Sequence, residues 1–361
     1  MSSNSIRVAA GQVLVVGFPE KGPSEGLIEL ARAGSLGGFI LFRRNLGSPE
    51  AAAELSARLR SYAAGGPIPW IAVDQEGGRV ARLRAPVLTL PPARVLGDLD
   101  DLALTQEAAR ELGWQLAALG FNLDFAPVLD VDTNPENPVI GDRSYGRDVA
   151  RVIRHARAFA AGLRASGITA CGKHFPGHGD TLLDSHLALP RLTHGEARLR
   201  EVELAPFAAL ARELPCIMTA HVVFDAWDPG VPATLSHRVV SGLLRTELGF
   251  EGLVFSDDLE MNAIASGYGM DDAACRAIEA GCDALLICSR EDYIERAYTG
   301  LVTRAERDSV FAQRLCEAAG RSIAARPAPL TKPLAPDAVA AALAAAPNAA
   351  LEARLAHAPR V

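Results

Sequence analysis

The chain has 361 residues, of which 49% are hydrophobic and 22% charged, so it can bury a large core and lacks the composition of a disordered protein. Its 36 basic and 43 acidic residues give a formal net charge of −7, which disfavours binding to nucleic acid. No apolar run suggests a membrane span, and Met1–Arg7 does not resemble a signal peptide. The six cysteines form no CxxC pair, and we expect buried reduced thiols in a cytoplasmic protein.

Eight short apolar segments predict strands. In chain order they are Val8–Phe18, Gly38–Phe42, Pro69–Asp74, Asn122–Val128, Thr169–His174, Cys216–Val222, Gly252–Asp257 and Ala284–Cys288. Most of them are continuously apolar and do not alternate with polar residues. This pattern is typical of strands that are buried on both faces of a parallel sheet.

Stretches rich in Ala, Leu and Arg lie between the strands and predict helices, among them Pro49–Tyr62, Leu102–Leu119, Asp148–Ser166, Glu196–Glu213 and Ser236–Leu248. Several helix-to-strand joints carry the glycine that commonly ends a helix, namely Gly120, Gly167, Gly249 and Gly281. Eight β-then-α units predict a single-domain α/β protein, a closed (β/α)₈ TIM barrel. An open doubly wound sheet is the alternative, but no G-x-G-x-x-G motif follows the first strand.

The barrel is predicted to span residues 1–325. Residues 326–361 are rich in Ala and Pro and poor in large apolar side chains. We expect this C-terminal tail to be partly helical, over Ala338–Ala346, or disordered. We assign no chemistry to it.

Polar residues gather at one end of the predicted strands. They follow or end the strands at their carboxyl termini, and they are Asp74, Asp130, Asp132, Lys173, His174, His221 and Asp257. Active sites of α/β barrels lie at this rim. The pattern therefore predicts an enzyme.

The segment Lys173–His186 reads Lys-His-Phe-Pro-Gly-His-Gly-Asp-Thr-Leu-Leu-Asp-Ser-His. One interpretation is a metal site, because four of its side chains are ligand types: His174, His178, Asp184 and His186. Another is a proton-transfer pair in which Asp184 orients His186. The residues alone favour the two interpretations about equally, and both over a loop whose histidines only form hydrogen bonds.

Two adjacent carboxylates, Asp257 and Asp258, end the seventh predicted strand. Neighbouring residues of a strand face opposite ways, so we expect at most one of them to point into the site. The other would cap a helix or face solvent. Periodicity does not decide between them.

These motifs resemble those of glycoside hydrolase family 3, specifically its single-domain bacterial β-N-acetylglucosaminidases of peptidoglycan recycling. The likeness runs from about Gly38 to about Ser289, and Lys173–His186 resembles the pattern K-H-F-P-G-H-G-x-T-x-x-D-S-H. Further matches are Asp74–Arg79, Phe125–Asp130, Asp142–Tyr145 and Ser256–Leu259.

The resemblance implies that Asp257 is the nucleophile, that His186 is the acid/base and that Asp184 is its dyad partner. It also implies a set of residues that bind the terminal sugar: Asp74, Arg82, Arg143, Lys173 and His174. His178 is expected to shape the loop. No metal and no cofactor are implied.

The function that follows is a retaining β-N-acetylhexosaminidase, active as a monomer on a small carbohydrate, an N-acetylglucosaminyl-anhydro-muropeptide, without nucleic-acid or membrane partners. Alternatives in the same family are a β-glucosidase and an N-acetylglucosaminide phosphorylase. Alternatives of other classes are a barrel metallohydrolase that uses the histidine cluster and a sugar-binding protein without activity.

Overall fold

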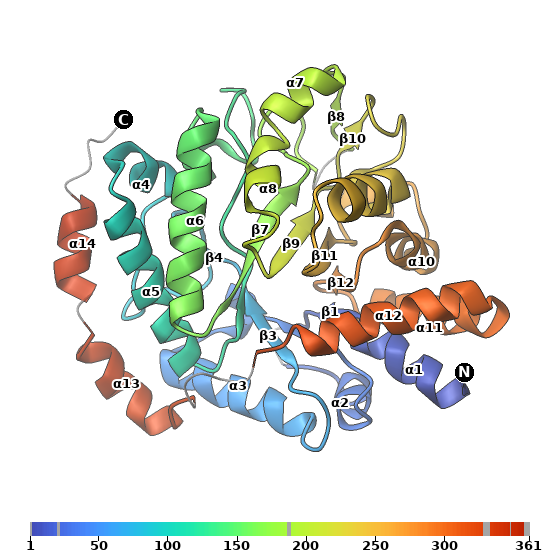
Figure 1. The fold of residues 1–361 in the computed structure, drawn as a ribbon. Coiled ribbons are helices and arrows are strands. Elements are labelled where there is room, and N and C mark those ends of the chain that lie inside the picture. The colour runs from blue at the N-terminus through green and yellow to red at the C-terminus, as the bar shows by residue number, and fades with distance from the viewer. Residues whose placement is uncertain (1, 20–21, 186–188, 328–332, 347, 357–361) are drawn as a thin grey trace.

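A computed structural model describes residues 2–19, 22–185, 189–327, 333–346 and 348–356. Eight parallel strands close into a barrel in the order β1-β12-β11-β9-β7-β6-β3-β2, with helices around it (Figure 1). The strands are β1 (Leu14–Val16), β2 (Gly38–Ile40), β3 (Trp70–Val73), β6 (Leu123–Asp124), β7 (Thr169–Phe175), β9 (Cys216–Thr219), β11 (Leu253–Asp258) and β12 (Ala284–Ile287). The predicted TIM barrel is confirmed, and each predicted strand segment contributes one strand.

Alternation along the strands divides their side chains between two cores. One set fills the lumen of the barrel and includes Val15, Ile40, Trp70, Ala72, Leu123, Phe125, Cys171, Cys216, Met218, Leu253, Phe255, Ala284, Leu286 and Cys288. Phe255 lies at its centre, with ring contacts to Phe125 at 5.2 Å and to Trp70 at 6.1 Å between centroids. Since large side chains fill the lumen, only the end of the barrel has room for a ligand.

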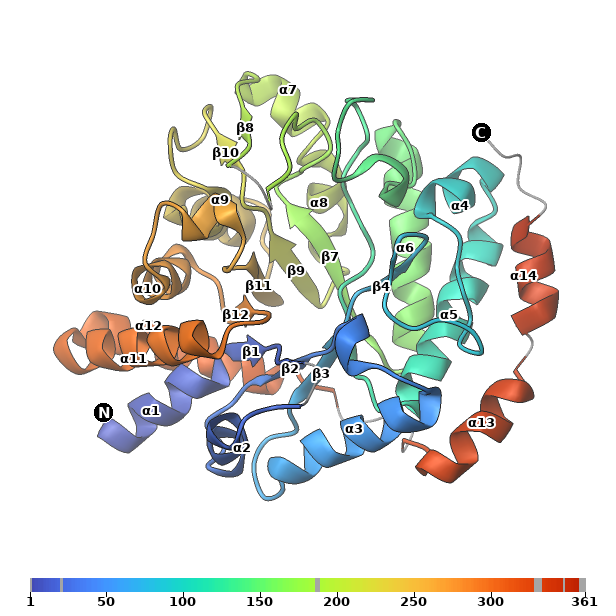
Figure 2. The same cartoon turned by 180° about the vertical axis from the view of Figure 1, so that it is seen from behind.

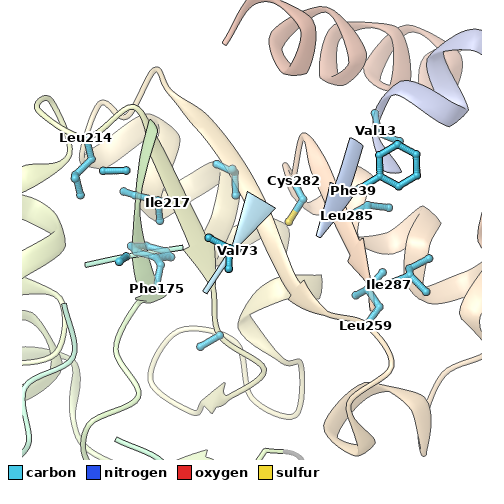
Figure 3. Close-up of a cluster of buried hydrophobic side chains, with 14 of the residues drawn as sticks. Val13, Phe39, Val73, Phe175, Leu214, Ile217, Leu259, Cys282, Leu285 and Ile287 are labelled. Atoms are coloured by element: carbon cyan, nitrogen blue, oxygen red, sulfur yellow. The ribbon is translucent and has the colours of Figure 1, made fainter. Parts of the chain in front are cut away.

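The intervening strand residues face outward and form the larger core between the barrel and its helices. Figure 3 shows part of this layer, with Val73, Ile217, Leu285 and Ile287 on barrel strands. This two-sided burial explains why the strands read as continuous apolar runs.

The surrounding helices are α2 (Glu25–Arg32), α3 (Pro49–Tyr62), α4 (Ala93–Leu99), α5 (Leu102–Ala118), α6 (Val149–Ala165), α7 (Glu196–Glu201), α8 (Ala205–Leu210), α9 (Asn262–Ala265), α10 (Met270–Ala280), α11 (Glu291–Arg307) and α12 (Ser309–Ala324). Short helical turns are η1 (Arg43–Asn45), η2 (Gly141–Arg143) and η3 (Ala233–Leu235), and η4 (Arg238–Glu247) is a π-helix. Gly120 and Gly281 end α5 and α10 with φ of +90° and +125°, as their positions predicted.

Two short ribbons lie outside the barrel. The strands β4 (Gln75–Gly77) and β5 (Val80–Ala81) pair antiparallel directly after β3. The strands β8 (Arg191–Leu192) and β10 (Val223–Phe224) pair in parallel and join the loops that follow β7 and β9. Both ribbons therefore belong to the carboxyl-terminal rim.

The prediction of one strand over Val8–Phe18 was wrong in its first half. Helix α1 (Ser3–Gln12) occupies that part, and only Leu14–Val16 forms a strand. The side chain of Ser2 caps the helix by accepting a hydrogen bond from Ser5 N at 3.2 Å. The apolar residues of α1 pack against α11 and α12, so their burial reflects a helix face (Figure 1).

The single helix predicted over Glu196–Glu213 is in fact two short helices, α7 and α8. The break falls at Val202, whose φ and ψ are −121° and −68°. Pro206 lies in the first turn of α8, where it lacks an N–H to donate to the preceding turn. A proline at this place starts a new helix more readily than it continues one.

Two helices lie in the tail, α13 (Pro336–Ala344) and α14 (Asn348–Ala356). They run along the outside of α3 and α5 (Figure 2). Their buried side chains are Val339, Leu343, Leu351 and Leu355. Asn348 donates to the carbonyl of Pro86 at 3.0 Å and accepts from Gln115 at 2.7 Å, which ties α14 to the loop before α4.

None of the six cysteines forms a disulfide; four are buried, and Cys275 and Cys316 are half-buried. Within the described residues, no helix combines the length and apolar character that a membrane crossing needs.

Candidate active site

Three of the predicted site residues continue the rows of lumen-facing side chains beyond the packed core, at the carboxyl ends of their strands. Asp74 follows Ala72 of β3, Lys173 follows Cys171 of β7, and Asp257 follows Phe255 of β11, each two residues further along its strand. All three line a cavity of about 290 Å³ at this end of the barrel. Arg82, Arg143 and His174 line it too. Six of the eight predicted residues are thus together.

Two irregular strand ends bring sequence neighbours to the same cavity. The register of β7 shifts between Gly172 and Phe175, and both Lys173 and His174 line the cavity. The register of β11 shifts between Phe255 and Asp258, and Asp257 and Asp258 line it together. The expectation that only one carboxylate of this pair would reach the site was therefore wrong, because regular alternation ends before the pair.

A buried ion-pair network forms one side of the cavity. Lys173 Nζ lies 2.9 Å from Asp74 Oδ1 and 2.5 Å from Glu76 Oε1. Arg82 binds the other oxygen of Asp74 at 3.1 Å, and Arg143 holds both oxygens of Glu76 at 2.8 and 2.9 Å. These contacts hold the charged groups in place before a ligand arrives.

The network keeps its carboxylates ionised. Burial raises the pKa of Asp74, but the positive charges of Lys173 and Arg82 lower it by more, so that the pKa lies well below its ordinary value. In the same way, burial raises the pKa of Glu76, while Arg143 and Lys173 lower it more strongly. The cavity wall thus presents alternating fixed charges that suit the hydroxyl and amide groups of a sugar.

Sequence reasoning missed Glu76 as a site residue. It is only two positions from Asp74, inside the motif Asp74–Arg79, and its side chain is buried. Its contacts with Arg143 and Lys173 join residues 67 and 97 positions apart. The motif itself could have indicated Glu76, but its partners could not be identified from local sequence.

Asp130 orients His174. The carboxylate accepts from His174 Nδ1 at 2.7 Å and from the backbone N–H of His178 at 2.7 Å, and it is fully buried. The other ring nitrogen of His174, Nε2, lies 3.5 Å from Arg143 Nη2. Asp130 therefore fixes the position of His174, which the sequence predicts to bind the sugar.

Asp257 and Asp258 have opposite electrostatic surroundings. Burial raises the pKa of Asp257, but His221 and His174 lower it below its ordinary value, helped by the N–H of Asp258 at 2.8 Å. Burial raises the pKa of Asp258 to about 7, and Glu260 adds to the effect. Asp257 is thus the carboxylate of the pair that is ionised at neutral pH, as the predicted nucleophile would need to be.

The loop after β7 is fixed around His178, which makes hydrogen bonds through both ring nitrogens. Nδ1 lies 2.8 Å from Thr181 Oγ1, and Nε2 lies 3.1 Å from Ser185 Oγ. Burial lowers the pKa of His178 to about 4, and the neighbouring His174 adds to this, so the ring is neutral. The expectation that His178 shapes the loop agrees with these contacts.

The predicted dyad is only partly visible. Asp184 is half-buried in the loop after β7, and its neighbour Ser185 lines the cavity. His186 lies outside the described residues.

Among the described residues, no three His, Cys, Asp or Glu side chains are arranged to hold a metal ion. Both nitrogens of His178 are already engaged, and Nδ1 of His174 is bound to Asp130. A larger, open groove of about 850 Å³ lies between α10 and α11, but none of the predicted site residues lines it. The chemistry therefore concentrates in the barrel cavity.

Comparisons with known proteins identify the family of the chain. The profile of the glycosyl hydrolase family 3 N-terminal domain matches residues 5–324. A β-hexosaminidase of Alkalilimnicola ehrlichii is 42% identical over 295 residues, which cover 80% of this chain and 83% of that protein.

Solved structures are similar throughout the barrel. A family 3 β-N-acetylglucosaminidase from Paenibacillus sp. FPU-7 superimposes with a TM-score of 0.85 at 44% identity, covering 88% of this chain and 61% of that longer chain. The protein NagZ from Neisseria gonorrhoeae superimposes with a TM-score of 0.80 at 34% identity, covering 97% of this chain and 98% of that chain.

Proposed function

The chain belongs to glycosyl hydrolase family 3 and is a glycoside hydrolase, and we propose that it is a retaining β-N-acetylhexosaminidase releasing terminal, non-reducing β-N-acetylglucosamine. The names of the relatives support this sugar. The observation that carries the proposal is the position of Asp257, an ionised carboxylate in the same cavity as the network around Asp74 and Lys173.

The terminal sugar is bound in this proposal by Asp74, Arg82, Arg143, Lys173 and His174. Arginine, lysine and histidine donate to sugar oxygens, and Asp74 accepts from hydroxyl groups. Because their own contacts fix these side chains, they can orient the anomeric carbon relative to Asp257 at little entropic cost.

The proposed reaction has two steps. Asp257 attacks the anomeric carbon and forms a covalent glycosyl-enzyme, while His186 protonates the departing oxygen. His186 then takes a proton from water, which releases the sugar with its configuration retained. Asp184 would stabilise the protonated imidazole, whose reference pKa of about 6.5 suits both roles.

We further propose the identity of the leaving group and the location of the protein in the cell. The family resemblance points to an N-acetylglucosaminyl-anhydro-muropeptide, processed by a cytoplasmic monomer during peptidoglycan recycling. The proposal needs no metal or cofactor, because Asp257 and His186 supply the nucleophile and the proton.

A release assay tests the proposed activity. We expect hydrolysis of an aryl N-acetyl-β-glucosaminide at least roughly 10²-fold faster, in kcat/KM, than of the matching aryl β-glucoside, since a site that hydrogen-bonds the acetamido group would reject a sugar that lacks it. Preference for the glucoside would indicate a β-glucosidase. A sugar phosphate product in phosphate buffer would indicate a phosphorylase, and loss of activity with a strong chelator would indicate a metallohydrolase.

Replacing the proposed acid/base tests the mechanism. His186→Ala is expected to reduce kcat/KM by roughly 10²–10⁴-fold for substrates with poor leaving groups and much less for activated aryl glycosides, because only the former need a proton. Rates measured along a series of aryl leaving groups report this difference as a slope. An equal loss along the series would contradict the assignment.

A further inference from the structure

The strand that carries the proposed nucleophile contains an extra residue near its end. Phe255 of β11 pairs with Ala284 of β12. The next residue pair is Asp258 with Leu286, so three steps along β11 match two steps along β12. This bulge breaks the alternation of side chains, and both Asp257 and Asp258 line the cavity. The direction of the Asp257 carboxylate therefore depends on the groups that hold the bulge.

On the β12 side, a serine hydroxyl replaces a backbone acceptor. Leu286 N donates to Ser256 Oγ at 3.0 Å, and Ser256 is fully buried. In a regular parallel ladder this N–H would donate to a carbonyl of the neighbouring strand. Just past the bulge, Leu259 N donates to the carbonyl of Leu286 at 3.0 Å. The hydroxyl of Ser256 thus satisfies a buried N–H at the point where the extra residue disturbs the ladder.

On the β9 side, a histidine ring replaces a backbone donor. The last residue pair between β11 and β9 is Phe255 with Met218. The same register, continued, would place Asp258 opposite His221, and there His221 Nε2 lies 2.9 Å from the carbonyl oxygen of Asp258. Because a carbonyl oxygen only accepts, Nε2 carries a hydrogen and donates it. The imidazole therefore continues the connection between the two strands.

His221 is one of the rim residues that the sequence pattern indicates, and the proposed reaction gives it no step. It is fully buried, and it is not among the residues that line the cavity. Its Nδ1 lies 2.8 Å from Thr234 Oγ1, which in turn lies 2.8 Å from Thr219 Oγ1. The ring is thus fixed on the side away from β11. Any effect of His221 on the sugar must pass through the end of β11.

We propose that His221 and Ser256 are positioning residues, which hold the bulge of β11 from its two sides and so direct the carboxylate of Asp257 toward the anomeric carbon. The inference rests on the proposed function, in which Asp257 is the nucleophile. The sugar-binding residues belong to other strands, since Asp74 follows β3 and Lys173 lies on β7. A loosened bulge should therefore slow the attack on the sugar and leave sugar binding unchanged.

Two amide substitutions of His221 test the contact with the Asp258 carbonyl. The amide nitrogen of glutamine extends about as far from the backbone as imidazole Nε2, whereas that of asparagine extends only about as far as Nδ1. His221→Gln therefore keeps a donor for this carbonyl, and His221→Asn loses it. Both variants lose the effect of the imidazole on the pKa of Asp257 equally. At neutral pH, we expect kcat/KM to fall roughly 10²-fold in His221→Asn and to recover most of that loss in His221→Gln.

The substrate for this test is 2,4-dinitrophenyl N-acetyl-β-glucosaminide. Its leaving group needs no proton, so kcat/KM reports the attack by Asp257 without the acid step. The inhibition constant of free N-acetylglucosamine reports sugar binding separately, and we expect it to stay at the wild-type value. Ser256→Ala tests the β12 side and keeps His221, and it is expected to give the same pattern. It decides the proposal by itself if His221→Asn does not fold.

His155→Asn is the matched control. His155 of α6 is also fully buried, with Nδ1 2.9 Å from Thr105 Oγ1 and Nε2 3.1 Å from Asp100 Oδ1. It is not among the residues that line the cavity. We expect its loss to lower the melting temperature and to leave kcat/KM of the folded protein at the wild-type value. Melting curves of every variant verify folding.

The proposed function and the positioning role fail differently. If wild type releases no dinitrophenol, the proposed function is wrong. If wild type is active and folded His221→Asn or Ser256→Ala keeps the wild-type kcat/KM, the positioning role is overturned. It is also overturned if His221→Asn and His221→Gln lose activity equally, because the imidazole and not its contact with Asp258 would then matter. A rise in the inhibition constant that matches the loss in kcat/KM would indicate damage to the whole cavity and would overturn it too.

Discussion

Asp257 and Asp258 show how adjacent residues of the same type receive different properties. Burial raises the pKa of Asp257, but the neighbouring His221 and His174 lower it by more. The pKa of Asp258 is raised by burial and by the charges of Glu260 and Asp257, against the N–H of Glu260, which donates to Oδ1 at 3.1 Å. The first carboxylate is therefore kept ionised, and the second holds its proton to about pH 7.

Substituting each aspartate in turn tests this distinction. Asp257→Asn is expected to lower kcat by roughly 10³-fold or more while the protein stays folded, because no covalent intermediate can form. Asp258→Asn is expected to cost much less, since the amide resembles the protonated acid. Steady-state kinetics with an aryl N-acetylglucosaminide measure both, and the reverse order would identify Asp258 as the nucleophile.

We expect the buried Asp124 to make the stability of the protein depend on pH. Burial raises its pKa to about 7, and Asp74 and Glu76 add to the rise against the opposing N–H of Gln75 and the charge of Lys173. An unfolded aspartate has a pKa of about 3.9. The folded state thus holds this proton more tightly, and the contribution of Asp124 to stability is lost as pH rises from about 4 through 7.

Asp124→Asn removes this titration. We therefore expect the melting temperature of the variant minus that of wild type to increase from pH 5 to pH 8. Differential scanning fluorimetry at several pH values within this window measures the difference. A difference that does not change with pH would show that Asp124 has an ordinary pKa.

At the scale of elements, the loop after β7 is fixed by contacts to the loop after β6. Thr133 donates to Asp180 at 2.8 Å, and Asn137 donates to the carbonyl of His178 at 2.8 Å. Gly179 lies so close to this neighbour that an added Cβ would be 1.8 Å from the carbonyl oxygen of Val131. Close packing of the two loops therefore fixes residues 178–180, which lead to Asp184.

Gly179→Ala is expected to displace this loop and to lower kcat/KM by roughly 10²-fold, because catalytic groups misplaced by about 1 Å lose that much. Gly195→Ala is the matched control. Gly195 has a φ of −65°, and no atom lies within 4 Å of a Cβ added there. Kinetics and melting curves of the two variants are compared, and wild-type kinetics in folded Gly179→Ala would show that this loop contact does not position the catalytic groups.

At the scale of the whole molecule, the barrel closes where β1 pairs with β12, with Leu14 opposite Leu285. Asp283 lies just before β12, fully buried, and accepts from Val254 N at 3.1 Å. Arg314 of α12 binds it at 2.8 Å, and Arg245 of η4 binds its other oxygen. One carboxylate thus joins two strands and two helices near the closing seam.

Removing this carboxylate is expected to destabilise the protein strongly. Asp283→Ala would leave Arg245 and Arg314 unpaired in a largely buried place, at a cost of roughly 3–5 kcal/mol in the free energy of unfolding. Glu213→Ala breaks the exposed pair with Arg157, which lies at 2.8 Å, and should cost about 0–1 kcal/mol. Denaturant unfolding measures both, and equal costs would contradict a structural role for Asp283.

The sequence by itself determined the barrel, because eight apolar segments and intervening helical stretches are local patterns that survive in the fold. It also located most of the site, since polar residues such as Asp74, Lys173 and Asp257 directly follow buried strand positions. Strand direction alone then places them at one rim. Their chemical roles came from a family resemblance, not from spacing.

Only the tertiary structure decided the contacts that give those residues their properties. The pairing of Glu76 with Arg143 and the entry of both Asp257 and Asp258 into the cavity depend on register shifts and on loops far apart in sequence. The helix Ser3–Gln12, whose second half was predicted as the start of a strand, packs against α11 and α12, a surface that exists only in the folded chain. Local sequence encodes backbone preference and burial, whereas pKa values and pair distances arise from neighbours that the chain meets only when folded.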